Sequence, residues 1–246
     1  MKIAGIEKCS MVDYPGHLAA VIFTAGCNLD CYYCHNHSLV HEPAAAAVRT
    51  WFETEMALAL LDKRLGFLDG VVITGGEPTL QADLADFIRK VRAKGYLVKL
   101  DTNGTRPTVL KGLIDEDLLD YVAMDIKAPI EKYEGVCGVP VDQDAINESI
   151  DSLLTGRVDY EFRTTVLPHH TESDILAIAR RIRGARRYVL QQYRRPDTDH
   201  HDPRLDLPPH TSTWPLGFLR ELQAIVNSCE LRGFEQPSLA PAASVA

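Results

Sequence analysis

The sequence lacks any apolar run long enough to cross a membrane. Its amino terminus carries Lys2 and Glu7, and the apolar run between them is too short for a secretory signal peptide. A basic excess is also missing, because 34 acidic against 26 basic residues give a formal net charge of −8, which opposes general attraction to nucleic acid or an anionic membrane. We therefore expect a cytoplasmic protein with no nucleic-acid partner and no membrane partner.

Internal repeats are also missing, and only residues 236–246, where Pro, Ser and Ala dominate, have the composition of a disordered tail. With 46% hydrophobic residues, the chain can bury one large core or two small ones. We predict a single domain over residues 1–235, with its core at about 17–193 and a C-terminal helix at about 213–229.

Six short runs of apolar or β-branched residues have the length of buried strands. Segments with helical spacing lie between these runs and after the last one. Such alternation predicts parallel strands with right-handed crossovers, in either an open doubly wound sheet or an incomplete barrel. The predicted strands are 19–24, 70–74, 97–102, 121–126, 160–166 and 187–192, and the predicted helices are 51–65, 80–94, 108–117, 143–154, 173–183 and 214–229.

Polar residues stand at or near the end of nearly every predicted strand. In α/β folds the carboxyl ends of parallel strands meet at one edge, where active sites assemble. We therefore expect these residues to converge in space. They are Cys27, the segment Thr74 to Pro78, the segment Asp101 to Gly104, Asp125 with Lys127, Arg163, and Gln191 with Gln192.

Three of the six cysteines, Cys27, Cys31 and Cys34, crowd into one loop, which in a reducing compartment indicates a metal site rather than disulfides. The spacing differs from that of paired zinc knuckles. A cubane iron–sulfur cluster ordinarily takes four cysteines, so three would leave one iron open to substrate. Two alternatives are a zinc ion with His35 or His37 as fourth ligand, and a loop without metal. The scattered cysteines have the character of small buried hydrophobes; they are Cys9, Cys137 and Cys229.

The cysteine spacing, with Tyr33 before the last cysteine and Gly-Gly-Glu-Pro at 75–78, resembles the radical S-adenosylmethionine superfamily. More narrowly, the chain is similar to glycyl-radical-enzyme activating proteins over about residues 3–193. The resemblance implies a partial (β/α)6 TIM-like barrel of parallel strands with outer helices. Segments 10–16, 34–36, 101–104 and 124–127 resemble the longer anaerobic ribonucleoside-triphosphate reductase activating proteins, and pyruvate formate-lyase activating enzymes share several of them.

The resemblance implies one [4Fe-4S] cluster held by Cys27, Cys31 and Cys34, with the amino and carboxylate groups of S-adenosylmethionine on the fourth iron. The segment Gly75, Gly76, Glu77 would contact the methionine amino group, and Lys127 would pair with the carboxylate. Further contacts are expected at Tyr33 and His35 around the adenine, at Asp101, Thr102 and Asn103 near methionine and ribose, and at Asp125 and Arg163.

Ordinary structural roles would also suit several of these residues. Gly75, Gly76 and Pro78 would serve a turn, and Asp125 with Lys127 could form a structural ion pair. The chain departs from lyase-type relatives at one point, because it has Gln191-Gln192-Tyr193 where they carry a histidine. It also lacks the additional cysteine sets of activases with a ferredoxin-like insert, so one cluster is predicted.

The implied reaction is reductive cleavage of S-adenosylmethionine, followed by removal of a hydrogen atom from a glycine Cα in a partner. The large subunit of anaerobic ribonucleotide reductase is the preferred partner, and flavodoxin or ferredoxin is the expected electron donor. Pyruvate formate-lyase or another glycyl radical enzyme, a small deazapurine precursor as substrate, and a non-enzymatic electron carrier or zinc-binding protein are the alternatives. A basic run forms either a solvated helix face or a docking surface for an acidic partner: Arg180, Arg181, Arg183, Arg186, Arg187, Arg194 and Arg195.

Overall fold

One curved, eight-stranded sheet organises the computed structural model, which describes residues 1–37, 52–195 and 202–234. The strands follow one another in chain order, with β1 antiparallel to β2 and every later neighbour parallel. No pairing joins β1 to β8 among these residues, so the sheet is open. The strands are β1 Ile3–Ser10, β2 Ala19–Thr24, β3 Gly70–Gly75, β4 Leu97–Thr102, β5 Tyr121–Asp125, β6 Asp159–Val166, β7 Tyr188–Gln192 and β8 Cys229–Arg232.

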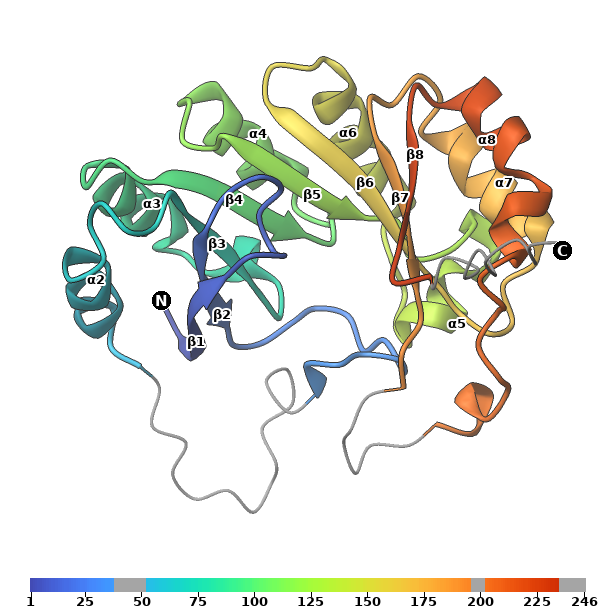
Figure 1. Ribbon diagram of the computed structural model, residues 1–246, viewed down its shortest axis with the longest axis horizontal. Coiled ribbons are helices and arrows are strands. Elements are labelled where there is room, and N and C mark those ends of the chain that lie inside the picture. Colours follow the sequence, from blue (N-terminus) through green and yellow to red (C-terminus); the bar gives the residue numbers. More distant parts are fainter. Residues whose placement is uncertain (38–51, 196–201, 235–246) are drawn as a thin grey trace, which may run out of the picture.

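Helices connect the parallel strands and line the outside of the sheet (Figure 1). The crossovers after β3, β4, β5 and β6 each carry at least one helix, as parallel pairing requires. The helices are α2 Thr54–Asp62, α3 Leu84–Arg92, α4 Pro107–Asp115, α5 Tyr133–Cys137, α6 Gln143–Leu154, α7 Glu172–Arg181 and α8 Leu219–Ile225.

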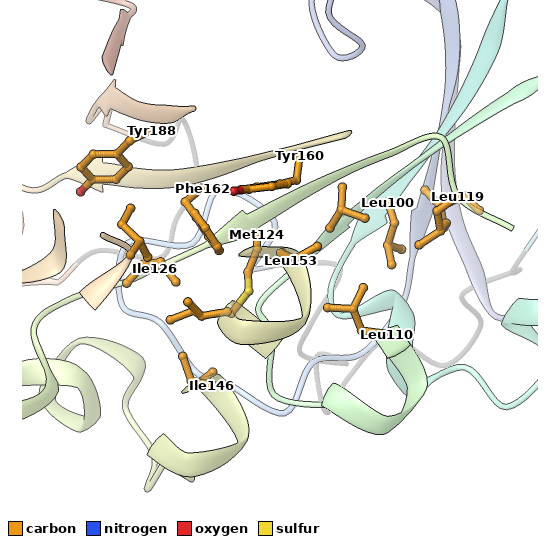
Figure 2. Packing of buried hydrophobic residues seen from close by; sticks show 14 of the residues in the cluster. Leu100, Leu110, Leu119, Met124, Ile126, Ile146, Leu153, Tyr160, Phe162 and Tyr188 are labelled. Atoms are coloured by element: carbon orange, nitrogen blue, oxygen red, sulfur yellow. The ribbon is translucent and has the colours of Figure 1, made fainter. Parts of the chain in front are cut away.

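The main core lies between the outer face of the sheet and these helices. Figure 2 shows Met124 of β5 and Phe162 of β6 beside Ile146 and Leu153 of α6. Each such side chain contributes about 1.5–3 kcal/mol when it is fully buried. This layer holds the strands in place through their outer face. Their inner face is not covered by these helices.

The inner face has two different halves. Around β2 and β3 it is apolar, with Val21, Val72 and Tyr14 in a small separate cluster. Around β4 to β6 it carries charged side chains, among them the almost fully buried Lys99 and Glu161. Buried charges are costly unless they are paired. The charged half of the inner face therefore needs ion pairs and hydrogen bonds, and it is a candidate for a functional site.

All six predicted strands are confirmed, and α6 has its predicted bounds. The short or edge elements β1, β8 and α5 were not predicted. The predicted helix 214–229 is wrong beyond Ile225, because the backbone is extended at Val226 and Cys229 begins β8, which pairs with β7. The predicted tail, 236–246, lies outside the described residues.

Candidate active site at the carboxyl ends of the strands

The cysteine loop follows β2 directly and is fixed by backbone hydrogen bonds. The amide of Ala25 donates to the Lys2 carbonyl at 2.9 Å, and the amide of Cys34 donates to the Cys31 carbonyl at 3.0 Å. Cys31 is buried, whereas Cys27 and Cys34 are half-buried. The three thiols are therefore held close to the carboxyl end of β2 and partly open to the space above it.

All of the predicted site residues line one cavity of about 250 Å³. They come from the cysteine loop and from the ends of β3, β4, β5 and β6, as the expected convergence requires. The individual contacts of these residues with a cofactor stay predictions. Five further residues line it. Thr74 and Gln191 were expected at the strand ends but without an assigned cofactor contact, and Leu29, Asn36 and Thr165 were not predicted as site residues.

The sequence contained evidence for three of these further lining residues. Asn36 belongs to the 34–36 segment already singled out, and Thr165 lies two residues after Arg163, on the same face of β6. Gln191 lies at the end of β7, where lyase-type relatives carry a histidine. This chain therefore has a side-chain amide in that part of the cavity wall.

Two glycines bring β3 close to the cysteine loop. The amide of Gly76 donates to the Thr24 carbonyl at 2.9 Å, and that of Glu77 donates to the Gly26 carbonyl at 2.8 Å. A Cβ atom on Gly76 would lie only 1.9 Å from the Gly26 carbonyl oxygen. Gly75 has a φ of +114°, a conformation that suits glycine. Any side chain at residue 76 would push the loop away from β3.

Glu77 ties the end of β3 to the end of β4. Its buried carboxylate accepts hydrogen bonds from the Thr102 hydroxyl at 2.8 Å and from the Asn103 amide at 2.7 Å, as well as from Thr79. Burial raises the pKa of Glu77, although these hydrogen bonds oppose the increase. The carboxylate thus has a positioning role inside the protein, in addition to its place in the cavity wall.

Asn103 extends this connection to the cysteine loop. Its side-chain amide donates to the Asn28 side-chain oxygen at 3.0 Å and approaches the Cys27 sulfur at 3.8 Å. The end of β4 is therefore in direct contact with the first cysteine.

An alternating chain of charges forms the floor of the cavity. Arg163 donates to Asp125 at 2.9 Å and to Asp101 at 3.2 Å, and Lys127 donates to Asp125 at 2.9 Å. Lys99 completes the chain by pairing with Asp101. Each charged group has an opposite charge beside it, which is the arrangement that buried ions need.

The pairing keeps the members of this chain ionised. Burial by itself would raise the pKa of both Asp101 and Asp125, but Arg163 acts together with Lys99 on Asp101 and with Lys127 on Asp125, and both pKa values lie below the ordinary value. For Lys127, burial lowers the pKa while Asp125 raises it, and the net result is a pKa well above the ordinary value. The floor therefore presents fixed charges at neutral pH.

Two rings flank the cysteines. Tyr33 is buried, and its ring lies 6.0 Å from the Lys127 ammonium group. His35 is exposed, with its ring 6.4 Å from that of Tyr193. Both side chains face the cavity.

The structure divides the basic run between the two edges of the sheet. Arg183, Arg186 and Arg187 precede β7 at its amino end, away from the cysteine loop, whereas Arg194 and Arg195 follow its carboxyl end. Arg187 donates to the Tyr121 hydroxyl, and Arg181 donates to Asn147 and to the Gln143 carbonyl. The run is not one docking surface.

None of the helices in residues 1–37, 52–195 and 202–234 has the length and apolar character needed to cross a membrane.

Residues 21–182 match the radical SAM superfamily. This span is more than half of the chain and contains the cysteine loop, the glycine pair at the end of β3 and the charged floor. The chain belongs to the radical SAM superfamily. Members of this superfamily use a [4Fe-4S] cluster and S-adenosylmethionine, which are therefore the cofactors of this enzyme.

Named relatives share this radical SAM character. A Methanocaldococcus jannaschii protein, provisionally named a glycyl-radical enzyme activating enzyme, is 35% identical over 87% of this chain and 90% of its own. The pyruvate formate-lyase 1-activating enzyme of Escherichia coli K12 is 31% identical over 51% of this chain and 52% of its own. The 7-carboxy-7-deazaguanine synthase of Koribacter versatilis is 29% identical over 67% of this chain and 69% of its own.

The radical SAM fold is also seen in solved structures. SuiB of Streptococcus suis, solved with bound S-adenosylmethionine, superposes with a TM-score of 0.62 over 87% of this chain and 50% of its own, at 14% identity. At that identity the likeness concerns the fold alone.

The donor set of the loop fits an iron–sulfur cluster. All three cysteines are free thiols in the cavity wall. Cysteine thiolates are the ligands that hold such clusters.

Proton release must accompany assembly of the radical SAM cluster. Burial raises the pKa of Cys27 to about 11 and also raises that of Cys34. The pKa of Cys31 is raised by a hydrogen bond with Cys137 and by burial. The free thiols are therefore protonated at neutral pH, and iron has to displace their protons.

Proposed function

We propose that this radical SAM enzyme is the activating enzyme of anaerobic ribonucleoside-triphosphate reductase. In this role it generates a glycyl radical on the large subunit of the reductase, with flavodoxin or ferredoxin as electron donor. The observation that carries the proposal is the likeness to the M. jannaschii activating enzyme over 87% of this chain and 90% of that protein. The segment 10–16 and the absence of further cysteine sets from the sequence favour the reductase as partner.

Cys27, Cys31 and Cys34 hold the cluster in this proposal. When bound, it supplies the electron that cleaves S-adenosylmethionine into methionine and a 5′-deoxyadenosyl radical. Burial of Cys31 and Tyr33 keeps water from these two side chains. Water exclusion matters because it prevents side reactions of a reactive intermediate.

The floor of the cavity binds the methionine end of the cofactor. An ammonium group has three donors, and Asp125 takes one donor of Lys127, so the others can bind the methionine carboxylate. Arg163, clamped between Asp101 and Asp125, fixes the position of both acids. Backbone at Gly75 and Gly76 reaches the amino group without side-chain obstruction, and Tyr33 with His35 frames the adenine.

The end of β4 completes the cofactor site. Thr102 and Asn103 face the methionine and ribose, and Glu77 holds both of them in place. Gln191 offers an amide on the opposite wall. Because these groups are held by hydrogen bonds before the cofactor arrives, little rearrangement is needed to orient it.

A sequence of anaerobic assays tests the proposal. The reconstituted enzyme, given dithionite and S-adenosylmethionine, is expected to form 5′-deoxyadenosine, and Cys31→Ala is expected not to. Addition of the reductase large subunit is then expected to give a glycyl-radical signal in electron paramagnetic resonance. A signal on pyruvate formate-lyase instead would transfer the proposal to that partner, and no 5′-deoxyadenosine at all would contradict it.

A small-molecule reaction is the second candidate. The relative named 7-carboxy-7-deazaguanine synthase matches 67% of this chain, and the charged inner face could hold a polar substrate. Consumption of S-adenosylmethionine that depends on a deazapurine precursor, with no protein partner present, would favour it.

A further inference from the structure

The cysteine loop also forms part of the wall of a second cavity. Cys31 and Tyr33 line the cofactor cavity, whereas Tyr32, which stands between Cys31 and Tyr33 in the chain, lines a separate cavity of about 380 Å³. The rings of Tyr32 and Tyr33 lie 5.8 Å apart in an edge-to-face arrangement. We call this second cavity the outer pocket. Its other walls include Lys132, Val136, His169, Arg204 and Leu207.

Tyr32 is fixed in this wall by two distant segments of the chain. Its hydroxyl is hydrogen-bonded to the His169 Nε2 at 2.9 Å. The Arg204 guanidinium lies 3.8 Å from the centroid of the Tyr32 ring, which is a favourable cation–π contact. Helix α5 lies beside the loop (Figure 1), where the Asp30 amide donates to the Cys137 carbonyl at 2.8 Å. The outer pocket is therefore already formed in the free protein.

The outer pocket reaches the cysteine loop from a side that the cofactor does not occupy. S-adenosylmethionine has to lie in the cofactor cavity when it is cleaved, so a protein that supplies the electron cannot enter there. A protein seated in the outer pocket contacts Tyr32, the chain neighbour of Cys31. Electron transfer between proteins is fast only over short distances, and the outer pocket provides such proximity to the loop that holds the cluster.

The chemistry of the outer pocket suits a negatively charged protein surface. Leu207 offers an apolar contact and is 54% exposed. The Lys132 side chain is 47% exposed, whereas its partner Asp174 is only 8% exposed. Likewise, Arg204 is 53% exposed and its partner Asp202 is 17% exposed. In both ion pairs the cation faces solvent and the carboxylate is largely covered.

The rim of the outer pocket is positive although the whole chain has a net charge of −8. Burial lowers the pKa of His169, so its ring is neutral at neutral pH. Among the lining residues, Lys132 and Arg204 then stand against the single carboxylate of Glu131. Complementary charge of this kind steers the encounter of two proteins and fixes their orientation.

We propose that the outer pocket is the docking site of an acidic, one-electron donor protein of the flavodoxin or ferredoxin class. The reduced donor loses one electron and the cluster gains it, while S-adenosylmethionine stays in the cofactor cavity. Electron-transfer interfaces are small, which fits a pocket of this size. The inference rests on the electron donor of the proposed function and is independent of the protein that receives the radical.

The test measures binding of a flavodoxin to full-length, anaerobically reconstituted enzyme with S-adenosylmethionine present. Isothermal titration calorimetry at low ionic strength gives Kd for wild type and for a double variant, Lys132→Glu with Leu207→Glu. The variant reverses a rim charge and places a second negative charge on the apolar contact. We expect Kd to rise about tenfold or more, as is typical of central interface residues.

A second double variant, Lys63→Glu with Leu65→Glu, is the matched control. It makes the same change of charge, and Leu65 has the same 54% exposure as Leu207. Lys63 and Leu65 follow α2, which lies far from α5 (Figure 1). The control should bind flavodoxin as wild type does. Both double variants should form 5′-deoxyadenosine at the wild-type rate with dithionite, because this small reductant needs no docking site.

Equal values of Kd for the two double variants would overturn the proposal. So would a wild-type enzyme that binds neither a flavodoxin nor a ferredoxin. If the outer-pocket variant bound flavodoxin normally but lost binding of the reductase large subunit, the pocket would serve the protein substrate instead, which also overturns it. Should that variant hold no cluster, Lys132→Gln decides: weaker binding of flavodoxin than wild type supports the proposal, and unchanged binding overturns it.

The proposed activase function can fail separately. It is tested with dithionite as the reductant, so the absence of a glycyl radical on the partner would contradict that function and leave the docking site standing. A normal glycyl radical with dithionite, together with unchanged flavodoxin binding in the outer-pocket variant, would do the reverse.

Discussion

Asp125 and Arg163 are register partners on β5 and β6, and the Arg163 Nε donates to the Asp125 Oδ1 at 2.9 Å. On its other side, Arg163 reaches Asp101 of β4 at 3.2 Å. One guanidinium therefore joins the ends of three neighbouring strands. The fork geometry of arginine permits this, and an ammonium group cannot reproduce it.

The first prediction concerns this fork. Arg163→Lys keeps the charge but should lose one of the two carboxylate contacts. A hydrogen bond to a charged group is worth about 1.5–3 kcal/mol, so KM for S-adenosylmethionine should rise about tenfold or more in the assay of 5′-deoxyadenosine formation without partner. Arg157→Lys, which alters an exposed pair with Asp115, is the control. Equal effects of both substitutions would refute a specific role for Arg163.

The second prediction concerns pH. Because the folded-state pKa of Asp125 lies below its ordinary value of 3.8, the ion pairs contribute stability above that pH and lose it as the pH falls below it. The difference in unfolding free energy between wild type and Asp125→Asn should be constant from neutral pH to about pH 5 and should shrink below pH 3.8. Urea unfolding of the cluster-free protein measures it. If the difference in unfolding free energy increased as the pH fell, the ion pairs of Asp125 would not be the source of this stability.

The third prediction concerns the contact between β3 and the cysteine loop. Gly76→Ala places a methyl group against the Gly26 carbonyl, and overpacking of this kind should cost about 3 kcal/mol of unfolding free energy. Iron uptake during reconstitution should fall with it. Gly112→Ala is the matched control, since nothing lies within 4 Å of a Cβ at that position in α4. It should raise the stability by up to about 1 kcal/mol.

The fourth prediction separates the two ends of the basic run. Arg183→Glu changes the amino edge of the sheet and should leave reduction by flavodoxin unchanged. Arg194→Glu changes an exposed residue beyond the carboxyl end of β7, on the side of the cysteine loop, and should slow reduction by an acidic donor at low ionic strength. Stopped-flow reduction at two salt concentrations tests both. If only Arg183→Glu slowed reduction, the donor would bind at the amino edge of the sheet, and the prediction would be wrong.

The sequence was informative where local patterns decide the structure. The parallel strands β2 to β7 are continuous apolar runs, so their positions were predicted. By contrast, β1 is a mixed polar and apolar edge strand, and β8 is only Cys-Glu-Leu-Arg. Such elements form because a neighbouring strand is available, which is tertiary information.

The site shows the same division. Cysteines, glycines and charged residues carry a chemical signal in the sequence and were predicted to converge. Leu29 and Thr165 carry none, because their place in the wall depends on how the loop and the strand fold. Cys137 was interpreted as a small hydrophobe, and only the folding of α5 against the loop brings it to Cys31.

A closed ring of strands would act as a sieve, because whatever entered it would have to pass through an aperture of fixed width. The sheet described here is a trough instead, since β1 and β8 are not paired among residues 1–37, 52–195 and 202–234. A polypeptide can lie across a trough without being threaded. The two sides of the trough differ in chemistry, because one is apolar at Val21 and Val72 and the other is ionic at Asp125 and Arg163.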